Sequence, residues 1–242
     1  MNTATKTALV TGAARGIGAG IAEVLAERGF RVILADIDEA QAHAAASALG
    51  DIHEGIALDV SNSTAVETAI SGIVERHGQL HVVVNNAGIN RDAMVHKMTD
   101  QQWDQVLAVD LSAVFYVSRA AGRHMRSKGY GRIINISSAS WEGNVGQANY
   151  AAAKAGVLGL TFTLSRELAR SSVTANAICP GFIETEMTKG IPQDVYDAQL
   201  AKIPLGHAGQ PSDVGKAVAY FASDDASYIT GQVLEVGGGY RI

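Results

Sequence analysis

Two side chains in the second half of the chain have the types and the spacing that proton transfer requires. Tyr150 and Lys154 are four residues apart at the start of a predicted helix, so both lie on one face of it. A phenol ordinarily keeps its proton up to about pH 10, and a neighbouring ammonium favours the phenolate. Such a pair can take a proton from an alcohol, or give one to a ketone, while a hydride moves to or from a cofactor. Without a wider pattern, the pair would be an ordinary surface contact.

A glycine-rich turn near the start of the chain offers a place for such a cofactor. Gly12, Gly16 and Gly18 follow an apolar run that predicts a strand over Thr7–Thr11. Glycines allow a tight turn and a close approach of the backbone to a pyrophosphate, and the helix that follows would aim its N-terminal amides at that anion. Turns use glycine for other reasons too, but the order of strand, glycine turn and helix predicts a dinucleotide site.

The residue at the end of the next predicted strand bears on which dinucleotide binds. Asp36 lies eighteen residues beyond Gly18, where a carboxylate accepts hydrogen bonds from a ribose and repels a 2′-phosphate. Arg15 in the glycine turn favours the opposite choice, because a guanidinium there could pair with a 2′-phosphate. A carboxylate in direct contact with the ribose should outweigh a mobile arginine, so the sequence predicts NAD(H) rather than NADP(H).

Apolar runs with strand character alternate with longer helical patterns along the chain. The predicted strands are Thr7–Thr11, Arg31–Ala35, Gly55–Leu58, Leu80–Val84, Arg132–Ile136, Val173–Ile178 and Gln232–Val236. The predicted helices are Ile17–Arg28, Glu39–Leu49, Thr64–His77, Gln101–Met125, Tyr150–Ala169 and Pro211–Ala222. This alternation predicts a doubly wound parallel sheet with helices on both faces, which binds ligands at the carboxyl ends of its strands. No repeat or linker divides the sequence, so residues 1–242 are expected to form one α/β domain.

Composition excludes several classes of protein. Apolar residues make up 47% of the 242 residues and charged residues 18%, which argues against a disordered chain. The net charge of -5 argues against a nucleic-acid surface. The single cysteine, Cys179, cannot form an internal disulfide, and no Cys/His cluster suggests a metal site. No segment reads as a signal peptide or a membrane span, so a cytoplasmic location is expected.

Three motifs in order resemble the short-chain dehydrogenase/reductase family. They are Thr11-Gly12-x-x-x-Gly16-x-Gly18, Asn85-Asn86-Ala87-Gly88 and Tyr150-x-x-x-Lys154. Residues 87–92 (AGINRD), 146–156 (GQANYAAAKAG) and 180–188 (PGFIETEMT) look especially like bacterial 3-oxoacyl-ACP reductases and acetoacetyl-CoA reductases. The resemblance implies a Rossmann fold with about seven strands in the order 3-2-1-4-5-6-7. It also implies a homotetramer with the long helices and the final strand at its interfaces.

The resemblance further implies a set of cofactor contacts. Gly12, Gly16 and Gly18 would line the pyrophosphate turn, with backbone contacts from Ile17; Arg15 of the same turn is the cofactor contact already considered for a 2′-phosphate. Residues that follow the third and fourth strands would bound the adenosine: Asp59, Val60, Asn86, Ala87 and Gly88. The nicotinamide side would be bounded by Pro180, Gly181, Ile183 and Thr185, together with Tyr150 and Lys154, whose ammonium would hold the ribose. Each of these residues also has an ordinary interpretation as part of a turn or a strand end.

The family places a serine thirteen residues before the tyrosine to bind the substrate oxygen. That count gives Ser137, whereas aligning on the strand gives Ser138 and a loop one residue shorter. Neighbouring residues of a strand point to opposite faces, so one of the two is aimed correctly. Insertions and deletions fall more easily in loops than in strands, which favours Ser138. Ser137 stays a serious alternative, and Ser140 a weaker one.

Asp110 stands where the family usually has asparagine. In the family, this position helps to hold a water that leads to the catalytic lysine, partly through its backbone carbonyl. Aspartate keeps that carbonyl, so a proton relay could survive, and its charge could raise the pKa of Lys154. The alternative is an ordinary helix residue with a solvated carboxylate.

Three functions remain in competition. The first is an NAD(H)-dependent oxidoreductase for 3-oxoacyl and 3-hydroxyacyl thioesters, carried by coenzyme A or an acyl-carrier protein. The second is a dehydrogenase of a cyclic or aromatic secondary alcohol; Asp36 supports an oxidative role, because biosynthetic acyl reductases generally use NADPH. The third is a noncatalytic dinucleotide-binding protein, which the intact Tyr150 and Lys154 oppose.

Two regions could contact a substrate or partner. Residues 184–209 are predicted to form a lid, whose apolar lining could come from Met187, Ile191, Tyr196 and Leu200. The segment between the serine and the tyrosine should border the pocket through Trp141, Gly143, Asn144 and Gln147. A basic stretch could dock an acidic carrier protein, although a solvated helix face is the default interpretation: Arg119, Arg123, Arg126, Lys128 and Arg132.

Overall fold

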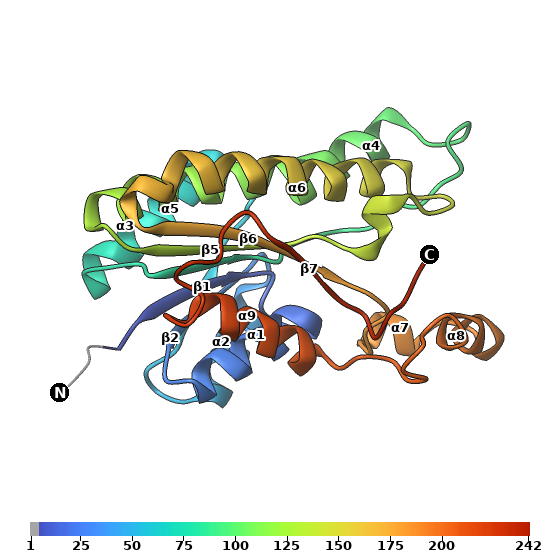
Figure 1. Cartoon of the computed structure of the whole chain (residues 1–242), viewed down its shortest axis with the longest axis horizontal. Helices are drawn as coiled ribbons and strands as arrows, with labels where there is room; N and C mark the ends of the chain where they lie inside the picture. The colour runs from blue at the N-terminus through green and yellow to red at the C-terminus, as the bar shows by residue number, and fades with distance from the viewer. Residues whose placement is uncertain (1–4) are drawn as a thin grey trace.

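The computed structural model describes residues 5–242, which form a seven-stranded parallel sheet between two layers of helices (Figure 1). The strands are β1 (Thr7–Thr11), β2 (Arg31–Asp36), β3 (Glu54–Ala57), β4 (Val82–Asn85), β5 (Gly131–Ile136), β6 (Val173–Pro180) and β7 (Val233–Val236). Their order in the sheet is β3-β2-β1-β4-β5-β6-β7. The predicted fold class and strand order are therefore confirmed.

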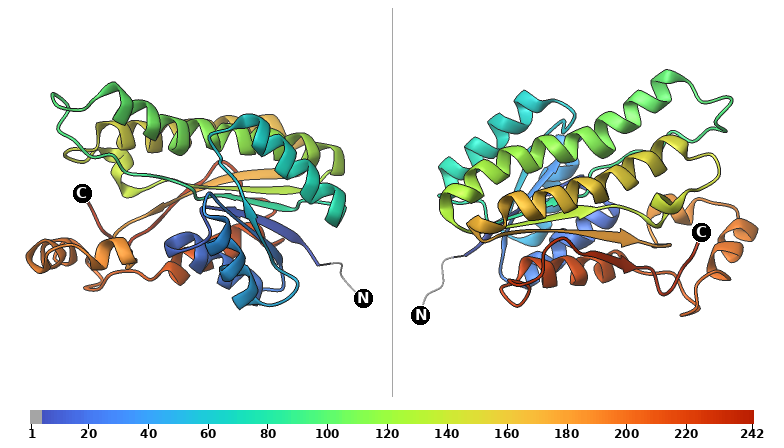
Figure 2. Two further views of the ribbon diagram at one scale, coloured as in Figure 1. Left: turned by 180° about the vertical axis from the view of Figure 1, so that it is seen from behind. Right: turned by 45° about the horizontal axis from the view of Figure 1, so that its top comes forward.

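Helices cover both faces of this sheet. Those of eight residues or more are α1 (Gly16–Glu27), α2 (Glu39–Leu49), α3 (Ser63–His77), α4 (Asp100–Leu107), α5 (Ala113–Lys128), α6 (Ala148–Leu168), α8 (Gln193–Leu200) and α9 (Pro211–Ala222). Figure 1 shows α1, α2 and α9 against one face, and α3, α5 and α6 against the other; a tilted view shows the second layer from above (Figure 2). No helix among residues 5–242 is long and apolar enough to cross a membrane.

Strand β1 shows how the sequence sorts side chains between the two layers. Ala8 and Val10 belong to the apolar core against α1 and α9, whereas Leu9 belongs to the core against α3 and α5. All three are fully buried, because a parallel sheet covered on both faces needs apolar residues on both sides. This is why β1 reads as a continuous apolar run rather than an alternating one.

The sequence predicts one long helix over Gln101–Met125, and the structure corrects this prediction in detail. It consists of α4 and α5 joined by a π-helical turn, η1, over Ala108–Ser112. A π turn accommodates an extra residue in an otherwise α-helical run, so the periodicity of the sequence hardly reveals it. The turn carries Asp110, whose carboxylate is completely buried.

The predicted lid region carries two helices. The short α7 (Glu186–Lys189) and α8 lie beyond the carboxyl end of β6 and are held there by Glu184. The Glu184 carboxylate accepts hydrogen bonds from Tyr196 on α8 and from Gln210 just before α9. Ile191, Tyr196 and Leu200 are partly exposed, and the side chain of Met187 lies outside the described part of the structure.

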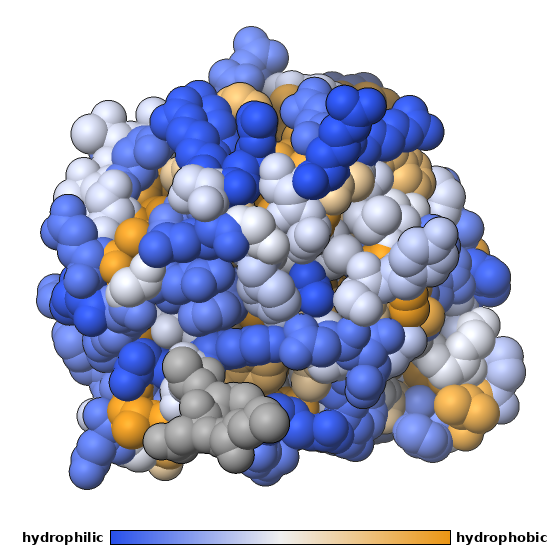
Figure 3. Space-filling model, turned by 60° about the vertical axis from the view of Figure 1, so that its left-hand side comes forward, coloured by the Kyte–Doolittle hydropathy of each residue, from blue (hydrophilic) through white to orange (hydrophobic). Residues whose placement is uncertain are grey.

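The predicted basic stretch lies at the opposite edge of the sheet from the carboxyl ends. Helix α5 ends at Lys128 and leads directly into the start of β5. Arg123 and Arg119 both pair with Glu67, and Arg132 is buried. Figure 3 turns that edge forward and shows a mainly hydrophilic surface with small, separate apolar areas. Arg126 and Lys128 are exposed at the end of α5, so only part of the stretch is engaged within the fold.

Candidate active site

The glycine turn between β1 and α1 is closely packed where it meets the neighbouring segment. Gly12 and Gly16 have φ angles of +62° and +59°, a region that favours glycine. A Cβ on Gly12 would lie 2.8 Å from the Cα of Ala87, and a Cβ on Gly18 would overlap the carbonyl oxygen of Gly12. Gly16 faces more open space, with the Thr185 side chain 3.8 Å from such a Cβ. These positions therefore need glycine for geometric reasons.

Thr11 and Asn86 fix this turn to the end of β4. The Asn86 amide donates to the carbonyls of Thr11, at 2.9 Å, and Gly12, at 3.0 Å. The Thr11 hydroxyl oxygen accepts hydrogen bonds from the backbone N–H groups of Asn86 and Ala87. The structure thus brings together the predicted site residues at the ends of β1 and β4. The side chain of Asn86 stabilises the glycine turn.

The start of helix α1 is suited to an anion. Its N-cap, Arg15, makes no side-chain capping bond, and the first turn holds no acidic residue. The exposed N–H groups at such a helix start carry partial positive charge. Together with the close glycine packing, this arrangement fits the pyrophosphate of a dinucleotide. Arg15 itself is exposed.

Asp36 lies where the next strand reaches the same edge. Its carboxylate accepts hydrogen bonds from the backbone N–H groups of Ala14 at 3.1 Å and Asp38 at 3.2 Å. Ala14 belongs to the glycine turn, so the carboxylate is held beside the predicted pyrophosphate position. Its two oxygens retain further lone pairs for ribose hydroxyls.

The other predicted cofactor residues border the same edge, several through their backbone. Asp59 is exposed and its carboxylate accepts from the N–H and hydroxyl of Ser61, whereas Val60 is buried. Ile17 packs partly against the core of the α1 layer, and Ile183 is buried in that core. Pro180 ends β6, and the Gly181 N–H donates to Val236. The Thr185 hydroxyl oxygen caps α7.

Lys154 and Asp110 form a buried ion pair at the centre of the site. Lys154 Nζ lies 3.2 Å from Asp110 Oδ2 and donates to the carbonyl of Ile136 at 3.2 Å. The same nitrogen is 5.3 Å from the ring centre of Tyr150. Burial alone would lower the pKa of Lys154, but Tyr150 and Asp110 outweigh it and raise that pKa above its ordinary value. The predicted Tyr150, Lys154 and Asp110 are therefore neighbours.

The two serines after β5 occupy different environments. Ser137 is buried, and its hydroxyl donates to the backbone carbonyl of Lys154 at 2.9 Å. Ser138 is half-buried, and its hydroxyl oxygen accepts from the N–H of Ser140. The O–H of Ser138 can therefore donate outward, whereas that of Ser137 is committed to helix α6. The Ser140 hydroxyl donates to Gln147.

Known proteins resemble the chain over nearly its whole length. A family model described as enoyl-(acyl carrier protein) reductase matches residues 12–241. The chain is 47% identical over 240 residues to a 3-oxoacyl-(acyl-carrier-protein) reductase, FabG, of Vibrio cholerae, covering 99% of this chain and 98% of the relative. The protein of the same name from Escherichia coli is 45% identical with the same coverage. An uncharacterized oxidoreductase of Mycobacterium bovis is 44% identical over 237 residues, 97% of this chain and 96% of the relative.

The chain belongs to the short-chain dehydrogenase/reductase family. It is accordingly an oxidoreductase that interconverts a ketone and an alcohol with a nicotinamide dinucleotide. The glycine turn, the uncapped start of α1 and the Lys154–Tyr150 neighbourhood described above fit that class of cofactor. The resemblance drawn from the sequence is confirmed at the level of the family.

Asn149 is a residue of this reductase site that the sequence analysis missed. It is fully buried, and its amide donates to the carbonyls of Arg91 and Gln102 while its oxygen accepts from the N–H of Tyr150. It thereby ties the loop after β4 and helix α4 to the helix that carries the tyrosine. The only signal in the sequence was a polar residue directly before Tyr150. Its role becomes clear only from its burial and its hydrogen bonds in the structure.

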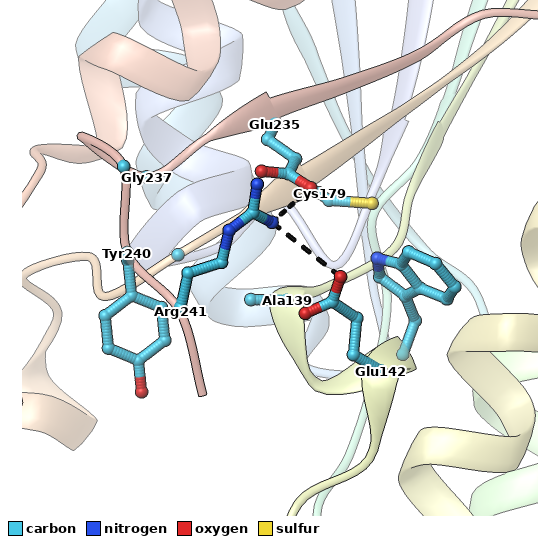
Figure 4. A pocket seen from close by; sticks show the side chains of 10 residues that line it. Ala139, Glu142, Cys179, Glu235, Gly237, Tyr240 and Arg241 are labelled. Atoms are coloured by element: carbon cyan, nitrogen blue, oxygen red, sulfur yellow. Dashed lines mark hydrogen bonds and ion pairs between the residues drawn. The ribbon is translucent and has the colours of Figure 1, made fainter. Parts of the chain in front are cut away.

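A cavity of about 140 Å³ opens on one side of the serine segment (Figure 4). It lies between the 3₁₀ turn η2 (Ala139–Glu142) and the tail after β7. Arg241 pairs there with Glu235 at 2.9 Å and with Glu142 at 3.7 Å. The ten residues that line it include Trp141 and Cys179, whose thiol pKa is raised by burial. Gly143, Asn144 and Gln147, predicted to border a pocket with Trp141, are not among those ten.

Proposed function

We propose that the chain is an NAD(H)-dependent oxidoreductase that interconverts 3-oxoacyl and 3-hydroxyacyl thioesters. The observation that carries the chemistry is the buried Lys154 ammonium beside the ring of Tyr150. The similarity to the 3-oxoacyl-(acyl-carrier-protein) reductases of Vibrio cholerae and Escherichia coli supports the substrate class. The position of Asp36 supports the choice of NAD(H).

The reaction needs a proton donor and acceptor at the substrate oxygen, and we assign that role to Tyr150. Lys154 would favour the phenolate through its charge and would hold the nicotinamide ribose. Ser138 would donate its free O–H to the same substrate oxygen, because the hydroxyl of Ser137 is engaged with Lys154. The dinucleotide supplies the hydride acceptor or donor when it is bound.

Cofactor contacts follow the geometry of the carboxyl edge. Gly12, Gly16 and Gly18 would admit the pyrophosphate, and backbone groups of the segment from Pro180 to Thr185 would border the nicotinamide. Asp36 would accept hydrogen bonds from the adenosine ribose, and its charge would repel a 2′-phosphate. Arg15 is the opposing influence, and its exposure makes its contact the weaker of the two.

Substrate and assembly are part of the same proposal. Residues 184–209 would form a lid over the acyl group. The thioester would be carried by coenzyme A or an acyl-carrier protein. The enzyme would be a homotetramer in the cytoplasm. A cyclic or aromatic secondary alcohol is the second candidate substrate, favoured by Trp141 beside the serine segment.

The test follows cofactor absorbance with acetoacetyl-CoA, using NADH and NADPH in parallel. Faster turnover with NADH supports both the thioester substrate and the role of Asp36. Faster turnover with NADPH overturns the cofactor assignment, and turnover only with cyclic or aryl alcohols and NAD⁺ overturns the thioester assignment. The matched control is Tyr150→Phe, which removes the proton donor and should lower kcat by about 10²- to 10⁴-fold, with a much smaller change in the Kd for NADH.

A further inference from the structure

The buried carboxylate of Asp110 is surrounded by features that accommodate its charge. Its Oδ1 accepts the backbone N–H of Ile89 at 2.9 Å, and its Oδ2 faces Lys154 Nζ at 3.2 Å. Gly88 leaves room for Oδ2, since a Cβ there would approach it to 2.6 Å. The π turn η1 holds Asp110 in this position, and such turns are frequent at functional sites.

One carboxylate oxygen accepts a hydrogen bond, and the other lies in ion-pair contact with a cation. Ile89 offers an N–H and Lys154 an ammonium, so the position requires two acceptors. A carboxylate supplies both, whereas an amide supplies one acceptor and would turn its NH₂ group toward a donor. The site is therefore matched to aspartate in charge and in hydrogen-bond polarity.

Lys154 needs such a partner because it is only 3% exposed. Burial expels the proton of a lysine unless an opposite charge is close, and a buried charge left without its partner is costly. The titratable groups that face Lys154 are Asp110 of η1, Tyr150 of α6 and Cys179 of β6, while β5 contributes the Ile136 carbonyl. Burial raises the pKa of the Cys179 thiol and also that of the Asp110 carboxyl, where Lys154 and the Ile89 N–H oppose the rise. A carboxyl starts from a much lower pKa than a thiol, and Asp110 lies in ion-pair contact with the ammonium, so it is the acidic group placed to balance the charge of Lys154.

We propose that Asp110 is a positioning residue, whose carboxylate keeps Lys154 protonated and holds its ammonium beside Tyr150. The proposal rests on the function assigned above, because Lys154 is the group through which Asp110 acts. It predicts that loss of the carboxylate charge releases the Lys154 proton at a lower pH. The alkaline limb of activity should then move in the same direction.

The direct test is a pH titration of ¹³Cε-labelled lysine by NMR in the ligand-free chain, with the Lys154 signal assigned by its loss in Lys154→Arg. In Asp110→Asn, the Lys154 midpoint should fall by about one to three pH units. Gly88→Ala, which keeps every charge but presses on Oδ2, should shift the midpoint in the same direction by less. Asp104→Asn, the same change at an exposed residue of α4, is the matched control and should leave the midpoint unchanged.

An unchanged Lys154 midpoint in a folded Asp110→Asn variant overturns the proposal, as does an upward shift. Should that variant fail to fold, Gly88→Ala decides by the same criterion. The alkaline limb of kcat with acetoacetyl-CoA and NADH should move down with the NMR midpoint, with a smaller change in KM. The titration needs no substrate, so a wrong substrate assignment leaves the NMR result readable, and the two failures are distinguishable.

Discussion

The hydroxyl of Ser137 donates to the backbone carbonyl of Lys154 at 2.9 Å, which joins the end of β5 to the helix that carries the tyrosine. This bond gives the two neighbouring serines different tasks. Ser137 supports the position of helix α6 from within the core. Ser138, half-buried and next along the chain, keeps an O–H that can reach a substrate.

Exchanging each serine for alanine should separate these tasks. Ser138→Ala should lower kcat by about 10²- to 10³-fold, because it removes a donor to the oxygen that changes charge during the reaction. Ser137→Ala should instead lower the free energy of unfolding by about 1 kcal/mol, with a smaller loss of kcat. Steady-state kinetics and urea unfolding of both variants provide the comparison. A larger kcat loss for Ser137→Ala would reverse the assignment.

Gly18 provides a test of the dinucleotide turn. A Cβ at this position would overlap the carbonyl oxygen of Gly12 and press on the Asn86 amide. Gly18→Ala should therefore displace the turn and raise the Kd for NADH at least about tenfold, a loss of about 1.4 kcal/mol. Gly159→Ala is the control, because Gly159 lies in helix α6 and a Cβ there would meet no atom within 4 Å. Equal NADH affinity for the two variants would contradict the assigned turn.

Asp36 should decide the choice between the two dinucleotides. Asp36→Asn keeps the size of the side chain and removes the charge that would repel a 2′-phosphate. The ratio of kcat/KM for NADPH to that for NADH should rise at least about tenfold. Adding Arg15→Ala should reverse most of this gain, since the guanidinium would then be the main partner of the phosphate. A ratio unaffected by Asp36→Asn would show that another group sets the preference.

Much of this fold can be predicted from the sequence because its strands are buried on both faces. Runs such as Leu9–Val10 and Val82–Val84 read as strands without any partner in view. The alternation with helices then places Asp36, Asn86 and Ser138 at one edge, since parallel strands end together. The family motifs add the pairing of Tyr150 with Lys154.

Other features depend on contacts between distant segments. Asp110 reads as one more helix residue, and its meaning comes from the π turn and from Lys154, forty-four positions further along. Adjacent serines carry the same chemistry, so only the partner of each hydroxyl distinguishes Ser137 from Ser138. Asn149 likewise gains its role from the carbonyls of Arg91 and Gln102.

Three histidines accept backbone N–H groups at or next to the starts of strands: His53 and His81, which directly precede β3 and β4, and His124 of helix α5. His81 Nδ1 accepts the backbone N–H of Thr7 at 2.9 Å, and His53 Nδ1 accepts that of Val32 at 3.1 Å. His124 Nε2 accepts the N–H of Leu80 at 3.3 Å. A ring nitrogen can accept only when it carries no proton. In each case burial is the main cause that lowers the histidine pKa.

The protein should therefore lose stability in mild acid through His81 above all. Burial, with Lys6 and His124 nearby, lowers the pKa of His81 to about 4, whereas an unfolded chain has a histidine pKa of about 6.5. The proton thus favours the unfolded chain. The contribution of neutral His81 to the free energy of unfolding is complete above about pH 6.5 and is lost as the pH falls toward about 4.

His81→Gln tests this, because an amide oxygen can accept from Thr7 without titrating. The free energy of unfolding, measured in urea at pH 7.5, 5.5 and 4.5, should fall less steeply with acid in this variant than in the wild type. His96→Gln, at an exposed histidine, should retain the wild-type slope. A His81→Gln slope equal to that of the wild type would mean that carboxylates elsewhere govern the acid response. The geometry argues otherwise, because the bond to Thr7 closes the start of the central strand β1 and any proton on Nδ1 must break it.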